Sequence, residues 1–115
     1  MSVTIYHNDQ CGTSRAVLEM IRETGTEPVV IDYMKTPPER DVLLAMLVAM
    51  DMPPRALLRT KETAYADLGL SDEALSDRAL LDAMLAHPQL MERPVVISDK
   101  GVRLCRPKEK VLEIL

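Results

Sequence analysis

The sequence contains no phenylalanine and no tryptophan, and only three of its 115 residues are tyrosine. It therefore offers no aromatic stacking platform, and its core must be built from leucine, valine and isoleucine together with eight methionines. No run of roughly 18 apolar residues is present, which excludes a transmembrane helix. The first residues lack the basic and apolar regions of a signal peptide, so none is expected.

Cysteine is scarce as well. Cys11 and Cys105 are the two cysteines and lie far apart, which argues against the disulfide framework of a small secreted domain. A reducing, cytoplasmic location is predicted instead. No C-x-x-C motif is present, and His7 and His87 do not have the spacing of metal ligands. No metal site is therefore expected.

Positive charge is in slight deficit, with 14 Lys and Arg against 18 Asp and Glu and a formal net charge of −4. This balance disfavours general binding to nucleic acid or to an anionic membrane, so neither is expected as a partner. It does not exclude a small basic pocket. The length and the apolar content of 47% are typical of one folded domain, which we expect to cover residues 1–115.

The order of the apolar runs predicts a β-α-β unit, a helical insertion and a closing β-β-α unit. Two strands joined by a helix favour parallel pairing, and Asp99-Lys100-Gly101 is typical of a hairpin turn. The fold class is therefore α/β or α+β, with a mixed four-stranded sheet and an insertion at about 33–90 between the second and third strands. Strands are expected at 3–6, 28–32, 94–97 and 102–105, and helices at 13–24 and 107–115.

Four local expectations concern the insertion and the second strand. Thr36 and Glu39 have the spacing of a capping box, and Ser76 is a typical residue to begin a later helix. The second strand is apolar at consecutive positions, so we expect it to be buried on both faces. The apolar face of the first helix of the insertion would comprise Leu43, Leu44, Leu47 and Val48.

Cys11 lies in the loop between the first strand and the first helix. A helix N-terminus presents unpaired N–H groups and positive partial charge, which stabilise a thiolate and an oxyanion. The Ser14 hydroxyl could hydrogen-bond the sulfur, while His7 and Arg15 could add positive charge. The position of Ser14 rules out a dithiol C-x-x-C motif, and Val17 stands where a cysteine phosphatase loop needs arginine. The alternative is a small cysteine buried in a loop.

Three arginines occupy junctions between expected elements: Arg59 ends a short helical turn, and Arg93 and Arg106 each stand beside a strand and before a proline. Arginine forks match tetrahedral oxyanions. Taken singly, each arginine is better explained by a surface ion pair or by a hydrogen bond to a backbone carbonyl, so only their shared junction positions favour an anion site. A cis bond between Arg93 and Pro94 would explain a proline that opens a central strand, although a trans proline at a strand start is the alternative.

These residues carry a resemblance to a known family. The chain resembles the glutaredoxin-linked arsenate reductases, which have a thioredoxin-like fold with a helical insertion. The resemblance spans nearly the whole chain, and it is specific as a combination rather than in any one motif. The matching segments are 5–8, Cys11-Gly-Thr-Ser-Arg15, 18–21, 25–28, Arg55-Ala-Leu-Leu-Arg59, His87-Pro88, Arg93-Pro94 and 103–107.

The resemblance implies an oxidoreductase that converts arsenate to arsenite in arsenic detoxification. The nucleophile falls on Cys11, and the residues that activate it fall on His7 and Ser14. The residues that bind the substrate oxyanion are three arginines, Arg59, Arg93 and Arg106. The Cys11 thiolate would attack arsenate, glutathione would attack the adduct as co-substrate, and glutaredoxin would remove glutathione as arsenic is reduced. No tightly bound cofactor is implied.

Two other functions are compatible with the same residues. A monothiol reductase of glutathione mixed disulfides would use Cys11, but three arginines exceed its needs. A non-catalytic, redox-related regulator of the same fold usually carries a C-x-x-C switch and lacks the full arginine set. The presence of Ser14 and of the arginines weighs against it.

Overall fold

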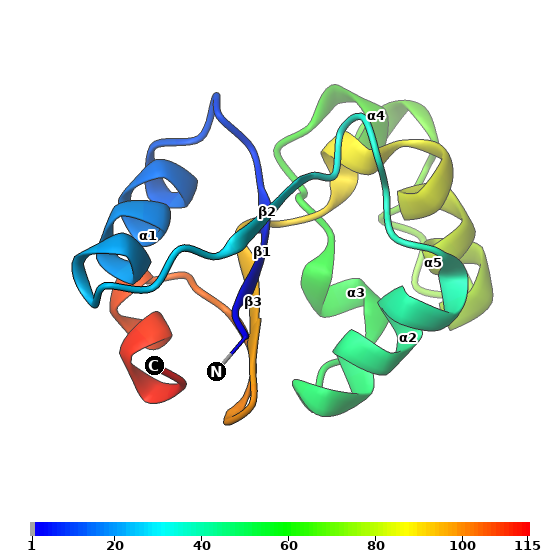
Figure 1. Ribbon diagram of the computed structural model, residues 1–115. Coiled ribbons are helices and arrows are strands. Elements are labelled where there is room, and N and C mark those ends of the chain that lie inside the picture. The colour runs from blue at the N-terminus through cyan, green and yellow to red at the C-terminus, as the bar shows by residue number, and fades with distance from the viewer. Residues whose placement is uncertain (1) are drawn as a thin grey trace. The chain divides into compact units, whose positions relative to one another are not determined.

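The computed structural model describes residues 2–115, in which four strands form one mixed sheet (Figure 1). Strand β1 (Thr4–His7) pairs in parallel with β2 (Val29–Asp32) and antiparallel with β3 (Val95–Ser98). Strand β3 in turn pairs antiparallel with β4 (Gly101–Leu104), so the strand order is β2-β1-β3-β4. The predicted β-α-β unit and the hairpin are both confirmed.

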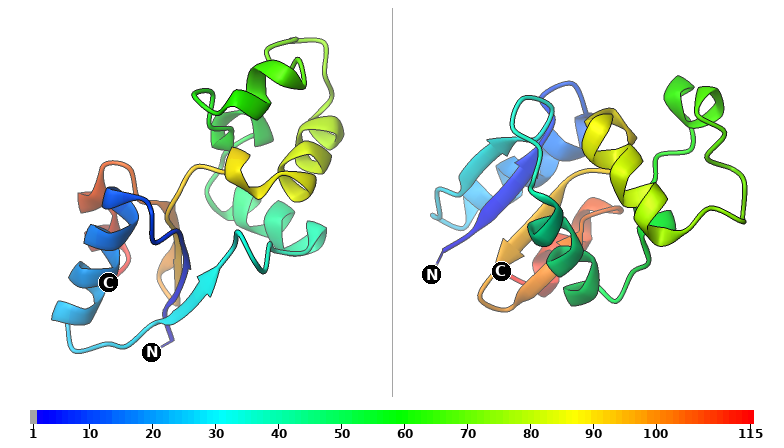
Figure 2. Two further views of the ribbon diagram at one scale, coloured as in Figure 1. Left: turned by 90° about the horizontal axis from the view of Figure 1, so that it is seen from above. Right: turned by 90° about the vertical axis from the view of Figure 1, so that its right-hand side faces the viewer.

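Two helices cover one face of this sheet. Helix α1 (Gly12–Glu23) connects β1 to β2 and packs beside η2 (Lys108–Glu113), as two views show (Figures 1 and 2). Gly25 follows α1 with a φ of +84°, the left-handed conformation that commonly ends a helix. The shared core is aliphatic apart from one cysteine, and it comprises Val3, Ile5, Val17, Ile21, Val96, Cys105, Val111 and Ile114.

The C-terminal helix differs from the expected one in type and length. The segment predicted as a helix over 107–115 forms a six-residue 3₁₀ helix, η2. Val111 in this helix and Ile114 directly after it are buried and three positions apart, which suits the three residues per turn of a 3₁₀ helix. This spacing directs both side chains into the core under the sheet.

The prediction that the second strand is buried on both faces is wrong. Strand β2 is one of the two edge strands of the sheet, and the side chains of Val29 and Val30 are exposed. Consecutive valines fit an edge strand as well as a central one, because β-branched residues favour extended backbone at either place. The run of apolar residues therefore identified the strand but not its position.

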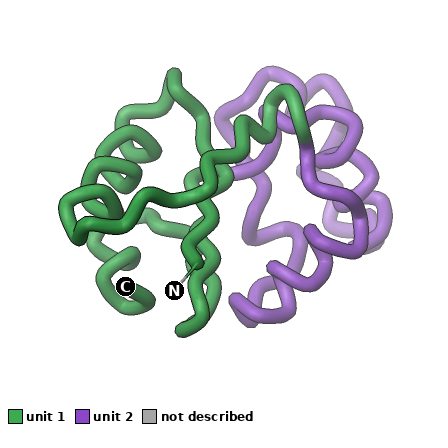
Figure 3. Tube along the Cα trace, in the orientation of Figure 1, with its two compact units in different colours: residues 1–36, 93–115 green, residues 37–92 purple. Residues whose placement is uncertain are grey.

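The chain divides into two compact units (Figure 3). The sheet unit contains the residues up to Thr36 together with Arg93–Leu115, and the helical unit contains Pro37–Glu92. The helical unit therefore lies between β2 and β3 in the chain, as predicted for the insertion. The expectation of a single domain over residues 1–115 stays a prediction.

The helical unit contains four α-helices and a short 3₁₀ helix. Helix α5 packs against α2, α3 and η1. The sequence did not predict α4 and η1 as separate elements. Within residues 2–115, no helix is long and apolar enough to cross a membrane. The elements are α2 (Arg40–Ala49), α3 (Pro54–Leu57), α4 (Thr63–Asp67), α5 (Asp77–Ala86) and η1 (Pro88–Leu90).

One of the two predicted helix starts is correct. Ser76 precedes α5, and its hydroxyl accepts the Ala79 N–H at 3.1 Å, as predicted. The capping box at Thr36 is wrong, because α2 begins only at Arg40 and has Glu39 as its N-cap residue without a side-chain cap. A residue that precedes proline is disfavoured in the helical conformation. Because Pro37 precedes Pro38, the helix does not begin directly after Thr36.

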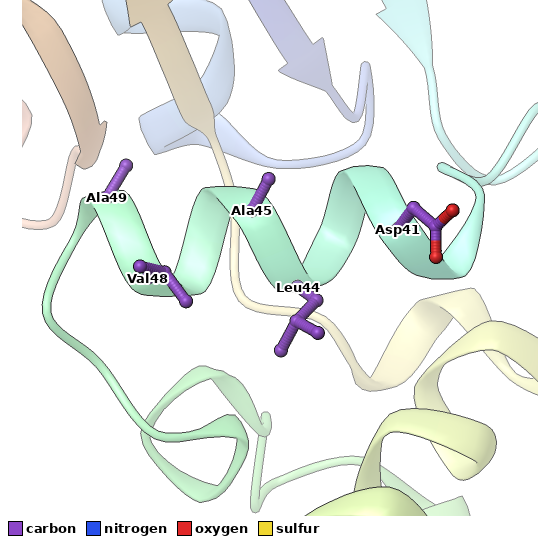
Figure 4. A pocket seen from close by; sticks show the side chains of 5 residues that line it. All are labelled: Asp41, Leu44, Ala45, Val48 and Ala49. Atoms are coloured by element: carbon purple, nitrogen blue, oxygen red, sulfur yellow. The ribbon is translucent and has the colours of Figure 1, made fainter.

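The predicted apolar face of α2 is half correct. Leu43 and Leu47, one helical turn apart, are buried, whereas Leu44 is 46% exposed and Val48 is 72% exposed. The exposed pair lines an apolar hollow with Asp41, Ala45 and Ala49 (Figure 4). These five residues include neither a sulfur nor a positive charge, so this hollow does not suit an oxyanion.

Candidate active site

Cys11 is held at the start of helix α1. It is the N-cap residue, with extended backbone, and its N–H donates to the Asn8 carbonyl oxygen at 3.0 Å. Its thiol is free and half-buried. The helix that follows has 12 residues, so the sulfur lies at the positive end of an aligned set of peptide dipoles.

The surroundings of Cys11 favour the thiolate. Burial raises the pKa of Cys11, but the Ser14 backbone N–H and the side chains of Arg93 and Arg106 lower the pKa by more than burial raises it. The Arg106 guanidinium donates to the sulfur, with Nη1 3.7 Å from Sγ. The pKa of Cys11 is therefore below that of an ordinary cysteine, in the direction the sequence predicted.

The Ser14 hydroxyl does not bond the sulfur, contrary to the expectation from sequence. It is fully buried, accepts the Asn8 N–H at 3.1 Å and lies 2.6 Å from His7 Nδ1. The other ring nitrogen of His7 lies 2.7 Å from an Asp9 carboxylate oxygen. Side chains on a helix tilt toward its N-terminus, which directs the Ser14 hydroxyl back to the end of β1. Ser14 thus contributes its backbone to Cys11 and its side chain to the loop.

Arg93 and Arg106 are brought together by the β3–β4 hairpin. Val95 pairs with Leu104, so the residues just before β3 and just after β4 are neighbours. Arg106 Nη1 donates to the Arg93 carbonyl oxygen at 3.0 Å, and Arg93 is buried. Each arginine precedes a proline through a cis peptide bond, of which the sequence indicated only the first. The hairpin therefore places two positive charges beside Cys11.

Arg59 belongs to the helical unit, where it follows α3. Its guanidinium contacts Glu62 and Glu92, each at 3.4 Å, and its N–H donates to the Leu90 carbonyl oxygen at 2.7 Å. The ion pairs that the sequence considered as the alternative are therefore present. A role for Arg59 in binding the oxyanion stays a prediction.

Two residues near Cys11 were not singled out from the sequence. Asn8 supplies both the carbonyl that accepts from Cys11 and the N–H that donates to Ser14. Tyr33 is 1% exposed, and the side chains of Asn8 and Arg93 and the charge of Cys11 all act on its hydroxyl. The sequence carried no signal for Tyr33, because only the register of β1 and β2, in which His7 pairs with Asp32, places Tyr33 beside Asn8.

Cys105 and the acidic residues are further reactive groups of the chain. Cys105 is buried in the core, as predicted, and burial raises its pKa to about 12. Across residues 2–115, no group of three or more His, Cys, Asp or Glu side chains could hold a metal ion. Cys11 is therefore the thiol with the surroundings of a nucleophile.

The fold and the site define a class of protein, in which a thioredoxin-like sheet presents one cysteine with a lowered pKa at a helix N-terminus beside arginine side chains. The model of the ArsC family matches residues 6–114, and the chain belongs to this family. This membership confirms the resemblance on which the thioredoxin-like fold was predicted.

Relatives named arsenate reductase and solved structures agree with this membership. The chain is 53% identical to an arsenate reductase of Escherichia coli K12 over 114 residues, which are 99% of this chain and 81% of that protein. It is 55% identical to an arsenate reductase of Rhizobium meliloti, over 100% of this chain and 82% of that protein. The structure of an arsenate reductase from Vibrio cholerae has a TM-score of 0.95 and 44% identity, and the match covers 100% of this chain and 98% of that one.

Proposed function

We propose that this chain is an arsenate reductase and that Cys11 is its nucleophile. The observation that carries the proposal is the Cys11 sulfur at the N-terminus of α1, with a lowered pKa and with Arg106 Nη1 3.7 Å away. The high identity to proteins named arsenate reductase supports arsenate as the substrate. Conversion of arsenate to arsenite is a two-electron reduction, which makes the protein an oxidoreductase.

Electrostatics explains why the arginines are needed. The thiolate and arsenate are both anions, so they repel each other unless positive charge lies between them. Arg93 and Arg106 neutralise the charge on the arsenic oxygens as the Cys11 sulfur approaches, and the N–H groups of α1 add to this effect. The Cys11–arsenic bond then forms as one oxygen leaves arsenic as water or hydroxide.

We assign His7 and Ser14 to the activation of Cys11. The 2.6 Å contact between them and the 2.7 Å contact of His7 with Asp9 fix the loop that holds Cys11. This fixed loop keeps the Ser14 N–H directed at the sulfur, where it favours the thiolate. We propose Arg59 as a third arginine that binds the oxyanion, and this assignment rests only on the match of Arg59 to the family motif.

The electrons must come from outside the chain. Cys11 is a single thiol, since Ser14 replaces a second cysteine and Cys105 is buried. We propose that glutathione, the co-substrate, attacks arsenic in the Cys11–arsenate adduct and displaces water or hydroxide. A glutaredoxin thiolate then takes the glutathione sulfur as a mixed disulfide, and the electron pair of the broken sulfur–arsenic bond stays on arsenic, which becomes As(III). Water then releases arsenite from Cys11. No tightly bound cofactor is needed. These donors require a reducing compartment, which supports a cytoplasmic location.

A coupled assay tests the proposal. The protein is mixed with arsenate, glutathione, glutaredoxin, glutathione reductase and NADPH, and the loss of NADPH is followed. We expect arsenate-dependent NADPH loss with the natural chain and none with Cys11→Ser. Cys105→Ala is the matched control and should keep the activity, because Cys105 lies in the core.

The assay also separates the other candidate functions. No arsenate-dependent NADPH loss with the natural chain would refute the proposal, as would activity retained by Cys11→Ser. With glutaredoxin left out, NADPH loss that depends on this chain and on a glutathione mixed disulfide in place of arsenate would favour the monothiol reductase. Inactivity with both substrates would favour a non-catalytic regulator.

A further inference from the structure

The hydroxyl of Tyr33 has no hydrogen-bond partner within residues 2–115, although it is buried. Tyr33 follows β2 directly. Because β1 and β2 are parallel and His7 pairs with Asp32, Asn8 and Tyr33 leave the sheet side by side. Asn8 also accepts the Cys11 N–H at 3.0 Å. Tyr33 and the Cys11 loop therefore begin at the same end of the sheet.

The groups that act on the Tyr33 hydroxyl are those of the candidate active site. Burial raises the pKa of Tyr33, the Asn8 side chain and the positive charge of Arg93 lower it, and the charge of Cys11 raises it further. The side chains of Asn8 and Arg93 are both near the hydroxyl, but neither reaches it with the geometry of a hydrogen bond. Because the net pKa is raised, the phenol keeps its proton at neutral pH and remains a donor.

A buried polar group without a partner destabilises a protein, so such a group calls for a physical reason. A ligand that accepts a hydrogen bond would supply the missing partner. The ligand that fits the neighbouring charges is an anion, because Arg93 and Arg106 lie beside Cys11. A tetrahedral oxyanion carries several acceptor oxygens and is the ligand class already proposed for this site.

We propose that Tyr33 Oη donates a hydrogen bond to an oxygen of the oxyanion bound at Cys11, which makes Tyr33 a substrate-binding residue. The inference rests on the proposed function for the place where the anion binds, but it adds a neutral donor to the charged ones. The phenol directs its proton at one oxygen, whereas the arginines neutralise the charge of the whole anion. Tyr33 would thereby orient the bound oxyanion for attack by the sulfur.

Tyr33→Phe tests this role, and Tyr6→Phe is the matched control. Both variants remove a phenol oxygen from a buried tyrosine of the sheet unit, but the Tyr6 oxygen is not among the buried atoms without a partner. The affinity for arsenate and for inorganic phosphate is measured by how far each anion protects Cys11 from alkylation by iodoacetamide. This measurement needs neither glutathione nor glutaredoxin.

We expect Tyr33→Phe to weaken protection by both anions by roughly ten- to a hundredfold, the range for a hydrogen bond to a charged group. The Tm of the ligand-free variant should equal or exceed that of the natural chain, because the hydroxyl has no partner to lose. Tyr6→Phe should leave protection unchanged. In the coupled assay, Tyr33→Phe should raise KM for arsenate by a similar factor.

Three results would overturn the proposal. Tyr33→Phe with a lower Tm and unchanged protection would show a purely structural hydroxyl. If Tyr33→Phe shifts the pH midpoint of Cys11 alkylation upward while both anions still protect Cys11, the Tyr33 hydroxyl acts on the sulfur and not on the oxyanion. Absence of protection by both anions in the natural chain would show that no oxyanion binds at Cys11. Protection that depends on Tyr33 without arsenate turnover would refute the proposed function alone.

Discussion

Replacing Ser14 with alanine separates the two roles that the structure assigns to this residue. The buried hydroxyl bonds Asn8 at 3.1 Å and His7 at 2.6 Å. Burial raises the pKa of Cys11, and the backbone N–H of Ser14 is foremost among the groups that lower it. Alanine removes the hydroxyl and keeps the N–H. We therefore expect Ser14→Ala to lose stability while its Cys11 thiol titrates nearly as before.

The expected loss follows from the groups left without partners. A buried polar group without its hydrogen bond costs about 1–3 kcal/mol. Ser14→Ala leaves two such groups, the Asn8 N–H and His7 Nδ1, and Asn8 is only partly buried. The free energy of unfolding should fall by about 2–4 kcal/mol, measured by urea denaturation. Ser76→Ala is the matched control and should cost about 1 kcal/mol, since its exposed hydroxyl caps one N–H.

The opposite pattern would refute this reasoning. The pH profile of Cys11 alkylation, followed by mass spectrometry, reports the titration of the thiol. If Ser14→Ala unfolds at the same urea concentration as the natural chain while its alkylation midpoint moves well upward, the hydroxyl acts on the sulfur directly. Ser14→Thr, which keeps a hydroxyl, should then restore the midpoint.

The two cysteines should differ in reactivity. The pH midpoint of Cys11 alkylation should lie below that of a free cysteine, because its pKa is lowered. Cys105 should react only on unfolding, because burial raises its pKa to about 12. Mass spectrometry of labelled peptides measures the alkylation of each cysteine, and equal labelling of the two would contradict the assignment of Cys11 as the reactive thiol. Because the pKa of Cys11 is lower in the folded chain, its contribution to stability is present above the unfolded value and lost as pH falls through the folded value. Urea midpoints of the natural chain and Cys11→Ser across that window check this sign. Arg93→Lys should raise KM for arsenate roughly tenfold, since an ammonium lacks the guanidinium fork, and an unchanged KM would count against Arg93.

Local sequence patterns predicted most of the sheet unit. The β-branched run before Cys11 and the valines after Pro28 each define a strand through local preference alone. Gly25 ends α1 as expected, because its positive φ suits glycine. What local pattern could not provide was the position of β2 at the edge of the sheet. Edge and central positions depend on pairing between strands that are distant in sequence.

The same distinction applies to the candidate site. The position of Cys11 before a helix is local information, and it sufficed to predict the direction of its pKa. The partners of the Ser14 hydroxyl were predicted wrongly, because they depend on how β1 and α1 meet. Tyr33 was missed for the same reason, since only the register of β1 and β2 brings it to the Cys11 loop.

The site geometry implies where discrimination between oxyanions must arise. Arg93, Arg106 and the N–H groups of α1 respond to charge and tetrahedral shape, which phosphate shares with arsenate. A hydrogen bond from Tyr33 would not separate the two anions either, since both present similar oxygens. The proposed reaction, however, is completed only when arsenic accepts an electron pair supplied through glutathione and glutaredoxin, and arsenic in arsenate is reducible whereas phosphorus in phosphate is not. Selectivity of the proposed reaction therefore lies in the reduction step rather than in binding, and the arginines serve the approach of two anions within a chain whose net charge is −4.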